Sequence, residues 1–139
     1  MDKPDFYSYP AVLQYEADGI HVTFPDLPGC VTFAASDREV IKEARDVLAL
    51  HLWGMEDDGD MPPTPSGIRT LAEKHKLQSN ETFFLVDAFM PPIREKMTKR
   101  FVKKTLSIPA WLNAQAESYG INFSQTLQKA LKHELQIAQ

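Results

Sequence analysis

Apolar and polar residues alternate along the first third of the chain with the period of two that is typical of β-strands. Residues 9–16 alternate loosely and residues 20–24 cleanly, and the Asp18-Gly19 pair between them is a typical hairpin turn. Short apolar runs also predict a third strand at residues 30–34 and a fourth at residues 81–87. Together these segments predict an antiparallel sheet.

Between the third and fourth strands the apolar period lengthens to that of an amphipathic helix. A helix capped by Ser36 or Asp37 is predicted over residues 38–55 and a shorter one over residues 68–76, with an acidic, proline-rich loop between them. Residues 1–90 therefore predict an α+β domain of the order β-β-β-α-β, with the long helix packed on one face of the sheet. The apolar stripe of this helix consists of Val40, Ala44, Val47, Leu48 and Leu52.

Residues 101–139 follow a different pattern. A short strand at 101–109 leads directly into a helix at 110–119, where Pro109 suits the first helical turn and Gly120 is a typical C-terminal stop. Ser124 is the predicted N-cap of a second helix, which runs from Gln125 to about Ile137. Residues 91–100, which begin with two prolines and end in a basic run, are the predicted linker between the two domains.

The strand at 101–109 has a polar and an apolar face, because successive side chains of a strand point to opposite sides. Three polar side chains in a row can read base edges in a groove wide enough for a two-stranded ribbon. A single strand cannot bury its apolar face alone, so its simplest partner is the same strand of a second chain. The polar face carries Lys103, Thr105 and Ser107, and the apolar face carries Val102, Leu106 and Ile108.

This order of strand, helix, glycine turn and helix resembles the ribbon-helix-helix family of DNA-binding domains. In that family two strands pair antiparallel across a dimer and lie in the major groove, while the N-terminus of the second helix anchors a phosphate. An ordinary amphipathic helical hairpin behind an edge strand is the alternative. The resemblance implies base reading by Lys103, Thr105 and Ser107, phosphate contacts by Lys104, Asn122, Ser124 and Gln125, and a dimer core of Val102, Leu106, Ile108, Leu112, Leu127 and Leu131.

A second resemblance rests on the loop Phe24-Pro25-Asp26-Leu27-Pro28-Gly29-Cys30, between the hairpin and the third strand. This loop is similar to the one found at this place in the HicB antitoxin family, and Pro63-Thr64-Pro65-Ser66 before the short helix also matches that family. The resemblance covers about residues 7–87. It departs from the family at Ala34-Ala35, where a glycine is expected.

Membership of the HicB family implies a toxin–antitoxin system without enzymatic activity or cofactor in this chain. The N-terminal domain is expected to be a partial ribonuclease H fold that lacks the catalytic residues and caps a small, HicA-like ribonuclease toxin that cleaves messenger RNA. The C-terminal domain is expected to form a homodimer that binds operator DNA and represses the chain's own operon. Whether dimers associate further into tetramers stays open.

The charge distribution agrees with two different partners. The net charge is −4, but eight of the 15 Lys and Arg and three of the 19 Asp and Glu lie from Arg94 onward. This end therefore carries a net +5 and suits DNA, whereas the preceding part carries a net −9 and suits a basic protein. The absence of an 18-residue apolar run and of signal-peptide features, and a single cysteine, Cys30, favour a cytoplasmic protein that contacts no membrane.

Other chemistry-bearing residues lack the spacing of a catalytic or metal site. The acidic side chains of Glu56, Asp57, Asp58 and Asp60 are predicted to lie in a solvated loop. The geometry of the local turn is sufficient to explain an aspartate at Asp26. Cys30 is predicted to be a small hydrophobic core residue. The four histidines are scattered, and no metal site is predicted. Two alternatives stay open: a stand-alone ribbon-helix-helix regulator with an N-terminal sensing domain, and a divergent nuclease of the ribonuclease H type.

Overall fold

The computed structural model describes residues 3–99 and 101–137. The chain divides into two compact units, Met1–Arg100 and Phe101–Gln139. The first unit is a four-stranded antiparallel sheet with helices, as the α+β pattern predicts, and the second contains two helices.

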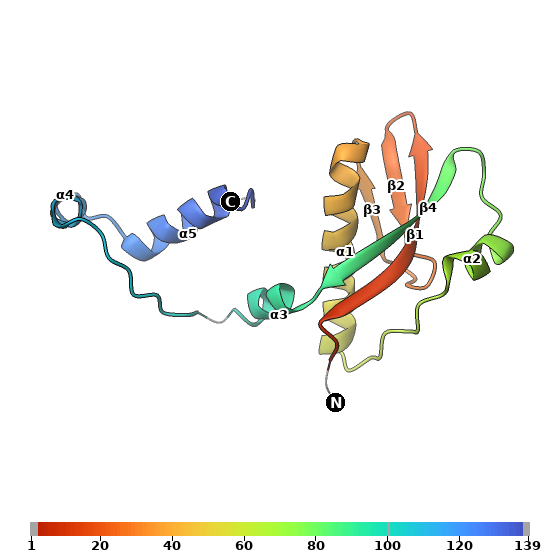
Figure 1. Ribbon diagram of the computed structural model, residues 1–139, viewed down its shortest axis with the longest axis horizontal. Helices are drawn as coiled ribbons and strands as arrows, with labels where there is room; N and C mark the ends of the chain where they lie inside the picture. The colour runs from red at the N-terminus through yellow and green to blue at the C-terminus, as the bar shows by residue number, and fades with distance from the viewer. Residues whose placement is uncertain (1–2, 100, 138–139) are drawn as a thin grey trace. The chain divides into compact units, whose positions relative to one another are not determined.

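The sheet of the first unit consists of β1 (Phe6–Glu16), β2 (Gly19–Thr23), β3 (Val31–Ala34) and β4 (Glu81–Phe89). Their order in the sheet is β3-β2-β1-β4, and every neighbouring pair is antiparallel (Figure 1). β1 is central and its middle residues are buried on both faces, whereas β3 and β4 are the outer strands. All four predicted strands are therefore confirmed, with β1 and β4 each extended at one end.

The hairpin between β1 and β2 forms where it is predicted, but Gly19 lies outside its turn. Glu16 pairs with Gly19, so the turn itself consists of Ala17 and Asp18. Gly19 has a φ of +144°, and a Cβ atom there would lie 2.5 Å from Cζ of Phe33. The glycine is needed because β3 approaches the backbone of β2 closely, which a turn signal in the sequence does not reveal.

Helix α1 (Asp37–Asp57) packs along one face of the sheet (Figure 1). Four of the five predicted stripe residues are buried, and Val47 packs against the core as a half-buried residue. Tyrosines of β1 bind the helix at both ends: Tyr15 donates to Asp37 (2.6 Å), and Tyr7 donates to Glu56 (2.8 Å). The corner between β3 and α1 forms without the glycine that the family pattern expects, because neither Ala34 nor Ala35 has a positive φ.

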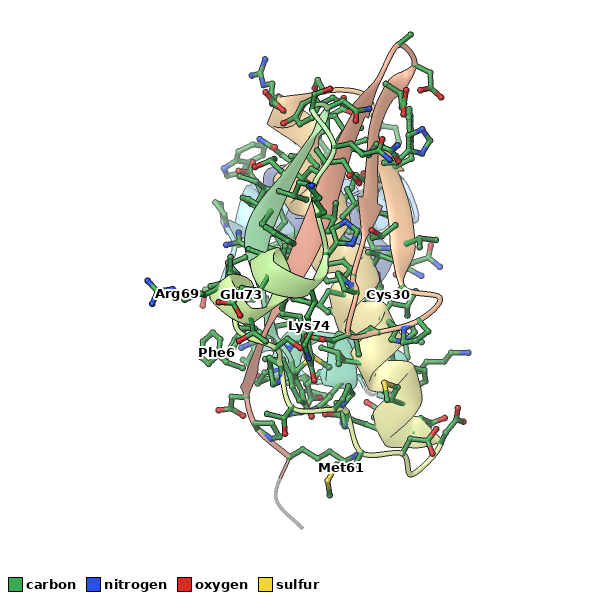
Figure 2. All side chains as sticks on the ribbon, turned by 90° about the vertical axis from the view of Figure 1, so that its right-hand side faces the viewer. Phe6, Cys30, Met61, Arg69, Glu73 and Lys74 are labelled. Atoms are coloured by element: carbon green, nitrogen blue, oxygen red, sulfur yellow. The ribbon has the colours of Figure 1, made fainter. Side chains whose placement is uncertain are left out.

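The short helix α2 (Ile68–Lys74) lies on the other face of the sheet, as Figures 1 and 2 show. Its Leu71 is buried, as are Pro10 and Val12 of β1, which point to that face. The sheet is therefore covered by the long α1 on one side and only in part by α2 on the other.

The predicted linker differs in the structure, because residues 91–98 form a helix, α3 (Pro91–Thr98). Its two prolines occupy the first turn, where a missing N–H is tolerated, and the helix ends at Lys99 with a left-handed φ of +57°. Met90 is fully buried and Ile93 packs against the core, so α3 belongs to the first unit.

The second unit consists of α4 (Ala110–Ser118) and α5 (Phe123–Glu134), and Gly120 ends α4 with a φ of +67°, as predicted. The N-cap of α5 is Asn122, whose side chain accepts a hydrogen bond from the Gln125 amide (3.0 Å), so the prediction of Ser124 as N-cap is wrong. In the single chain described, residues 101–109 do not pair in a strand.

Candidate functional site

The two faces of segment 101–109 are both open to solvent in the single chain. The predicted base-reading residues Lys103, Thr105 and Ser107 are exposed, and so are Val102, Leu106 and Ile108. Of the other predicted dimer-core residues, Leu127 is half-buried and Leu112 and Leu131 are exposed. The segment thus carries an unburied apolar row that another strand can cover.

Exposure of apolar side chains extends over the whole second unit. None of its described residues, 101–137, is buried, although it contains large apolar side chains such as Trp111 and Leu135. A short chain that buries nothing does not gain enough hydrophobic free energy to hold two helices together. The unit therefore requires a partner surface, and a symmetric dimer offers one.

The N-terminus of α5 carries three of the four predicted phosphate-binding residues, Asn122, Ser124 and Gln125, but not all of them are free to bind. Because Asn122 caps the Gln125 amide, that amide is already occupied. The first intrahelical bond runs from the Thr126 amide to the Asn122 carbonyl, so the amides of Phe123 and Ser124 precede the helical bonds. These two amides suit an anion at this helix end, whereas Gln125 can contribute only its side chain. Lys104, the fourth predicted phosphate contact, is exposed in segment 101–109.

A partly buried ion pair joins α3 to α1. The Arg94 guanidinium donates to both oxygens of Glu56, at 3.0 and 2.8 Å, and to the carbonyl of Pro4 at 2.7 Å. The Glu56 side chain is 3% exposed and that of Arg94 22%. Tyr7 donates the third hydrogen bond to Glu56. The prediction that Glu56 belongs to a solvated acidic loop is therefore wrong, while Asp57, Asp58 and Asp60 are exposed.

The pKa values of this network follow from its geometry. Burial acts to raise the pKa of Glu56, but the hydrogen bonds from Arg94 and Tyr7 outweigh it, so the pKa is lowered overall. Burial and then the hydrogen bond to Glu56 raise the pKa of Tyr7 to about 12. The bond to Glu56 raises the pKa of Arg94 further. The network is thus a charged pair with a neutral tyrosine, suited to hold α3 in place.

The two loops that carry the family resemblance meet in space. The Asp26 carboxylate accepts hydrogen bonds from the amide of Ser66 (2.8 Å) and from its hydroxyl (2.7 Å). Tyr9 donates to the carbonyl of Pro63, which fixes the same proline-rich segment to β1. The local turn is therefore not sufficient to explain Asp26, because its carboxylate holds a loop 40 residues away.

The apolar residues of the 24–30 loop, Phe24, Leu27 and Cys30, are part of the hydrophobic core. Leu27 and Cys30 are buried, and the loop closes on itself because the Phe24 amide donates to the Cys30 carbonyl (3.2 Å) and the Cys30 amide donates to the Leu27 carbonyl (3.0 Å). Burial raises the pKa of the Cys30 thiol to about 11, which makes it an unreactive packing residue, as predicted (Figure 2). Among the described residues, no group of three or more His, Cys, Asp and Glu is placed to hold a metal ion.

Comparisons with known proteins find similar proteins whose matches include residues of both units. A family model described as HicB-like antitoxin of bacterial toxin-antitoxin system matches residues 9–131. Among solved structures, a chain of a toxin–antitoxin complex from Streptococcus pneumoniae is 22% identical, with 93% of this chain and 99% of that chain covered and a TM-score of 0.55. The Burkholderia pseudomallei antitoxin HicB is 20% identical, with 90% and 96% covered and a TM-score of 0.53.

A curated relative from Haemophilus phage HP1, named an uncharacterized 14.9 kDa protein in the rep-hol intergenic region, is 34% identical over 55 residues. That match spans 39% of this chain and 41% of the phage protein's length. Within the described ranges 3–99 and 101–137, no helix combines the length and the apolar character that crossing a bilayer demands. Since the family match extends over most of the residues of both units, the chain belongs to the HicB-like antitoxins of bacterial toxin–antitoxin systems.

Proposed function

We propose that this antitoxin, which is not an enzyme, neutralises a HicA-like messenger-RNA-cleaving toxin with its first unit and represses its own operon with its second. The observation that carries the proposal is the family match, which runs through both units. In this proposal the predicted partial ribonuclease H-like domain of residues 1–90 is completed by α3, the ribbon-helix-helix comprises residues 101–139, and the protein acts in the cytoplasm.

The proposed operator-binding form is a dimer in which two 101–109 segments pair as an antiparallel ribbon. Pairing would cover Val102, Leu106 and Ile108, which the single chain exposes, and would turn Lys103, Thr105 and Ser107 toward the bases. The proposed phosphate contacts come from Lys104 and from the start of α5, at Asn122, Ser124 and Gln125. Leu112, Leu127 and Leu131 complete the proposed dimer core.

Charge supports the proposed toxin contact of the first unit. The chain before Arg94 carries a net charge of −9, and a ribonuclease needs a positive surface to bind RNA phosphates. An acidic domain that covers this surface competes with RNA for it. A structurally similar protein comes from a toxin–antitoxin complex, which agrees with such a contact.

Operator binding is tested by measuring affinity for the chain's own promoter fragment and for random DNA of equal length. If Lys103 contacts a phosphate, Lys103→Ala is expected to reduce the slope of log K against log salt by about one unit. If it binds a guanine edge, the loss is about 1–3 kcal/mol and falls on the promoter fragment. Lys76→Ala, an exposed lysine of the first unit, is the control. Unchanged promoter binding after Lys103, Thr105 and Ser107 are all replaced contradicts the DNA proposal.

Toxin neutralisation is tested by co-expression with the protein encoded by the neighbouring open reading frame, with growth as the readout. Growth rescue by the wild-type chain, and binding that weakens as salt concentration rises, are expected. Absence of a neighbouring toxin gene, or no rescue with promoter binding retained, favours the stand-alone regulator instead. Metal-dependent nuclease activity of the purified chain would contradict the antitoxin assignment.

A further inference from the structure

Strand β4 presents a long free edge. It is nine residues long and lies outermost in the sheet, and within residues 3–99 and 101–137 no strand pairs with its outer side. Proteins usually guard such edges with lysine, proline or a bulge, because free N–H and C=O groups recruit other strands. β4 contains neither lysine nor proline. The opposite outer strand, β3, has only four residues and offers fewer backbone groups.

Three apolar side chains lie beside this edge and are called the edge patch: Phe6, Leu85 and Phe89. Phe6 pairs with Phe89 in the sheet and Leu85 with Pro10, so all three point to the face away from α1. Their exposures are 61% for Phe6, 56% for Leu85 and 50% for Phe89, and the two phenyl rings lie 4.8 Å apart. A free backbone edge beside an apolar patch is the arrangement that β-strand addition uses.

Charge distinguishes between the possible occupants of this edge. β4 contributes Glu81 and Asp87, of which Asp87 already pairs with Arg45 of α1 (3.0 Å). Asp5 precedes Phe6, and the chain before Arg94 carries a net charge of −9. A second copy would bring another domain with the same excess of acids to this edge and be repelled. A strand from a basic protein is attracted instead, and a ribonuclease that binds RNA has this character.

We propose that the outer edge of β4 and the edge patch form the docking site for an extended segment of the basic toxin, which adds a fifth strand to the sheet. This inference rests on the proposed antitoxin function and locates its contact surface. The backbone of β4 supplies hydrogen bonds along the added strand, and the edge patch buries apolar side chains of that strand. The net charge of −9 before Arg94 favours Lys or Arg on the incoming segment.

The test compares Leu85→Lys with Val31→Lys in the full-length chain. Both residues are apolar, 56% exposed and placed on outer strands at opposite sides of the sheet. The toxin encoded by the neighbouring open reading frame is the probe, and its dissociation constant and growth rescue are measured. Leu85→Lys is expected to weaken binding roughly 30-fold or more, because a buried apolar contact is replaced by a charge, whereas Val31→Lys stays within about threefold.

Two further measurements keep the result interpretable. Leu85→Thr retains a strand-forming residue and is expected to weaken binding in the same direction if the lysine variant is too unstable to study. Amide hydrogen exchange of β4 is expected to slow when toxin is bound, since its outer backbone groups become paired.

The outcomes separate this inference from the proposed function. If the wild-type chain binds the toxin and both lysine variants bind equally well, the docking site is wrong while the antitoxin function stands. If Leu85→Lys abolishes a self-association of the chain but leaves toxin affinity unchanged, a second copy occupies the edge and the inference is overturned. If the wild-type chain neither binds nor rescues, the proposed function itself fails.

Discussion

At the scale of single residues, Glu56 links three elements of the first unit, because this side chain of α1 accepts hydrogen bonds from Tyr7 of β1 and Arg94 of α3. It is a nearly buried carboxylate whose charge is balanced by Arg94 and Tyr7. Arg94→Met is expected to destabilise the chain by about 3 kcal/mol, near the lower end for a broken buried pair because Arg94 is partly exposed. Urea unfolding of the variant measures the loss.

The control for that prediction is the double variant Glu56→Gln/Arg94→Met. Removing the unpaired charge as well is expected to restore part of the lost stability, since an uncompensated carboxylate is the main cost. The same loss in Lys96→Met, an exposed lysine of the same helix, would show that α3 tolerates no methionine and that the ion pair is not responsible.

The same carboxylate predicts an acid-sensitive component of stability. The folded-state pKa of Glu56 is lowered, so its contribution is present above the unfolded value of about 4.3 and is lost as pH falls through the folded value. The unfolding free energy of the wild type is therefore expected to fall more steeply below about pH 4.3 than that of Glu56→Gln. Identical pH profiles contradict this assignment. Asp58→Asn, at an exposed acid, serves as the control.

Sequence reasoning at this scale is limited by distance along the chain. Cys30 and the buried stripe of α1 were predictable because period and residue type carry the information locally. Glu56 and Arg94 are 38 residues apart, and Asp26 and Ser66 are 40 apart. No local pattern indicates that either pair meets, so a solvated loop and a simple turn were the natural interpretations of Glu56 and Asp26.

At the scale of elements, the four strands and the helices α1, α2, α4 and α5 follow from apolar period and from glycine and proline signals. Helix α3 could not be recognised in this way, because Pro91-Pro92 favours a stiff linker unless the prolines occupy a first helical turn. That choice depends on tertiary contacts, namely the packing of Ile93 against the core and the pairing of Arg94 with Glu56 of α1.

The start of α5 gives a prediction that separates capping from DNA contact. Asn122→Ala is expected to destabilise the helix by about 1 kcal/mol, because it removes the acceptor of the Gln125 amide. Ser124→Ala is expected to cost little stability, since Ser124 lies inside the helix. Circular dichroism during thermal unfolding measures both variants. An equal loss in Ser124→Ala would contradict the assignment of Asn122 as the cap.

The hydrogen bonds between Asp26 and Ser66 predict that substitutions at either residue free the segment around Ser66 without unfolding the sheet. Ser66→Ala removes one hydrogen bond to the Asp26 carboxylate, and Asp26→Asn weakens both, so losses of about 1–2 kcal/mol are expected. Faster hydrogen exchange at the Ser66 amide is expected in Asp26→Asn, with the sheet unaffected. Thr64→Ala, in the same segment, is the control. Unchanged exchange at Ser66 would mean that the loop is held by Tyr9 and Pro63 alone.

At the scale of the whole molecule, the two units differ in whether a single chain supplies a hydrophobic core for them. The first unit has a core of its own, formed by one face of the sheet and α1. The described part of the second unit contains no fully buried residue and exposes its apolar row. The sequence could predict this need for a partner, because a strand with one apolar face must pair. It could not predict where the self-sufficient unit ends, since that depends on the docking of α3.

The end of the first unit yields a truncation prediction. A chain cut after Arg100 keeps α3 and the Glu56–Arg94 pair, and is expected to stay folded and monomeric and to neutralise toxin without binding the promoter. A chain cut after Ile93 loses Arg94, leaves Glu56 buried without its counter-charge, and is expected to unfold at a markedly lower temperature. Thermal unfolding and size-exclusion chromatography compare both with the full-length chain. Equal stability of the two truncations would show that α3 contributes nothing to the unit, while a dimer of the 1–100 chain would show that self-association does not require residues 101–139.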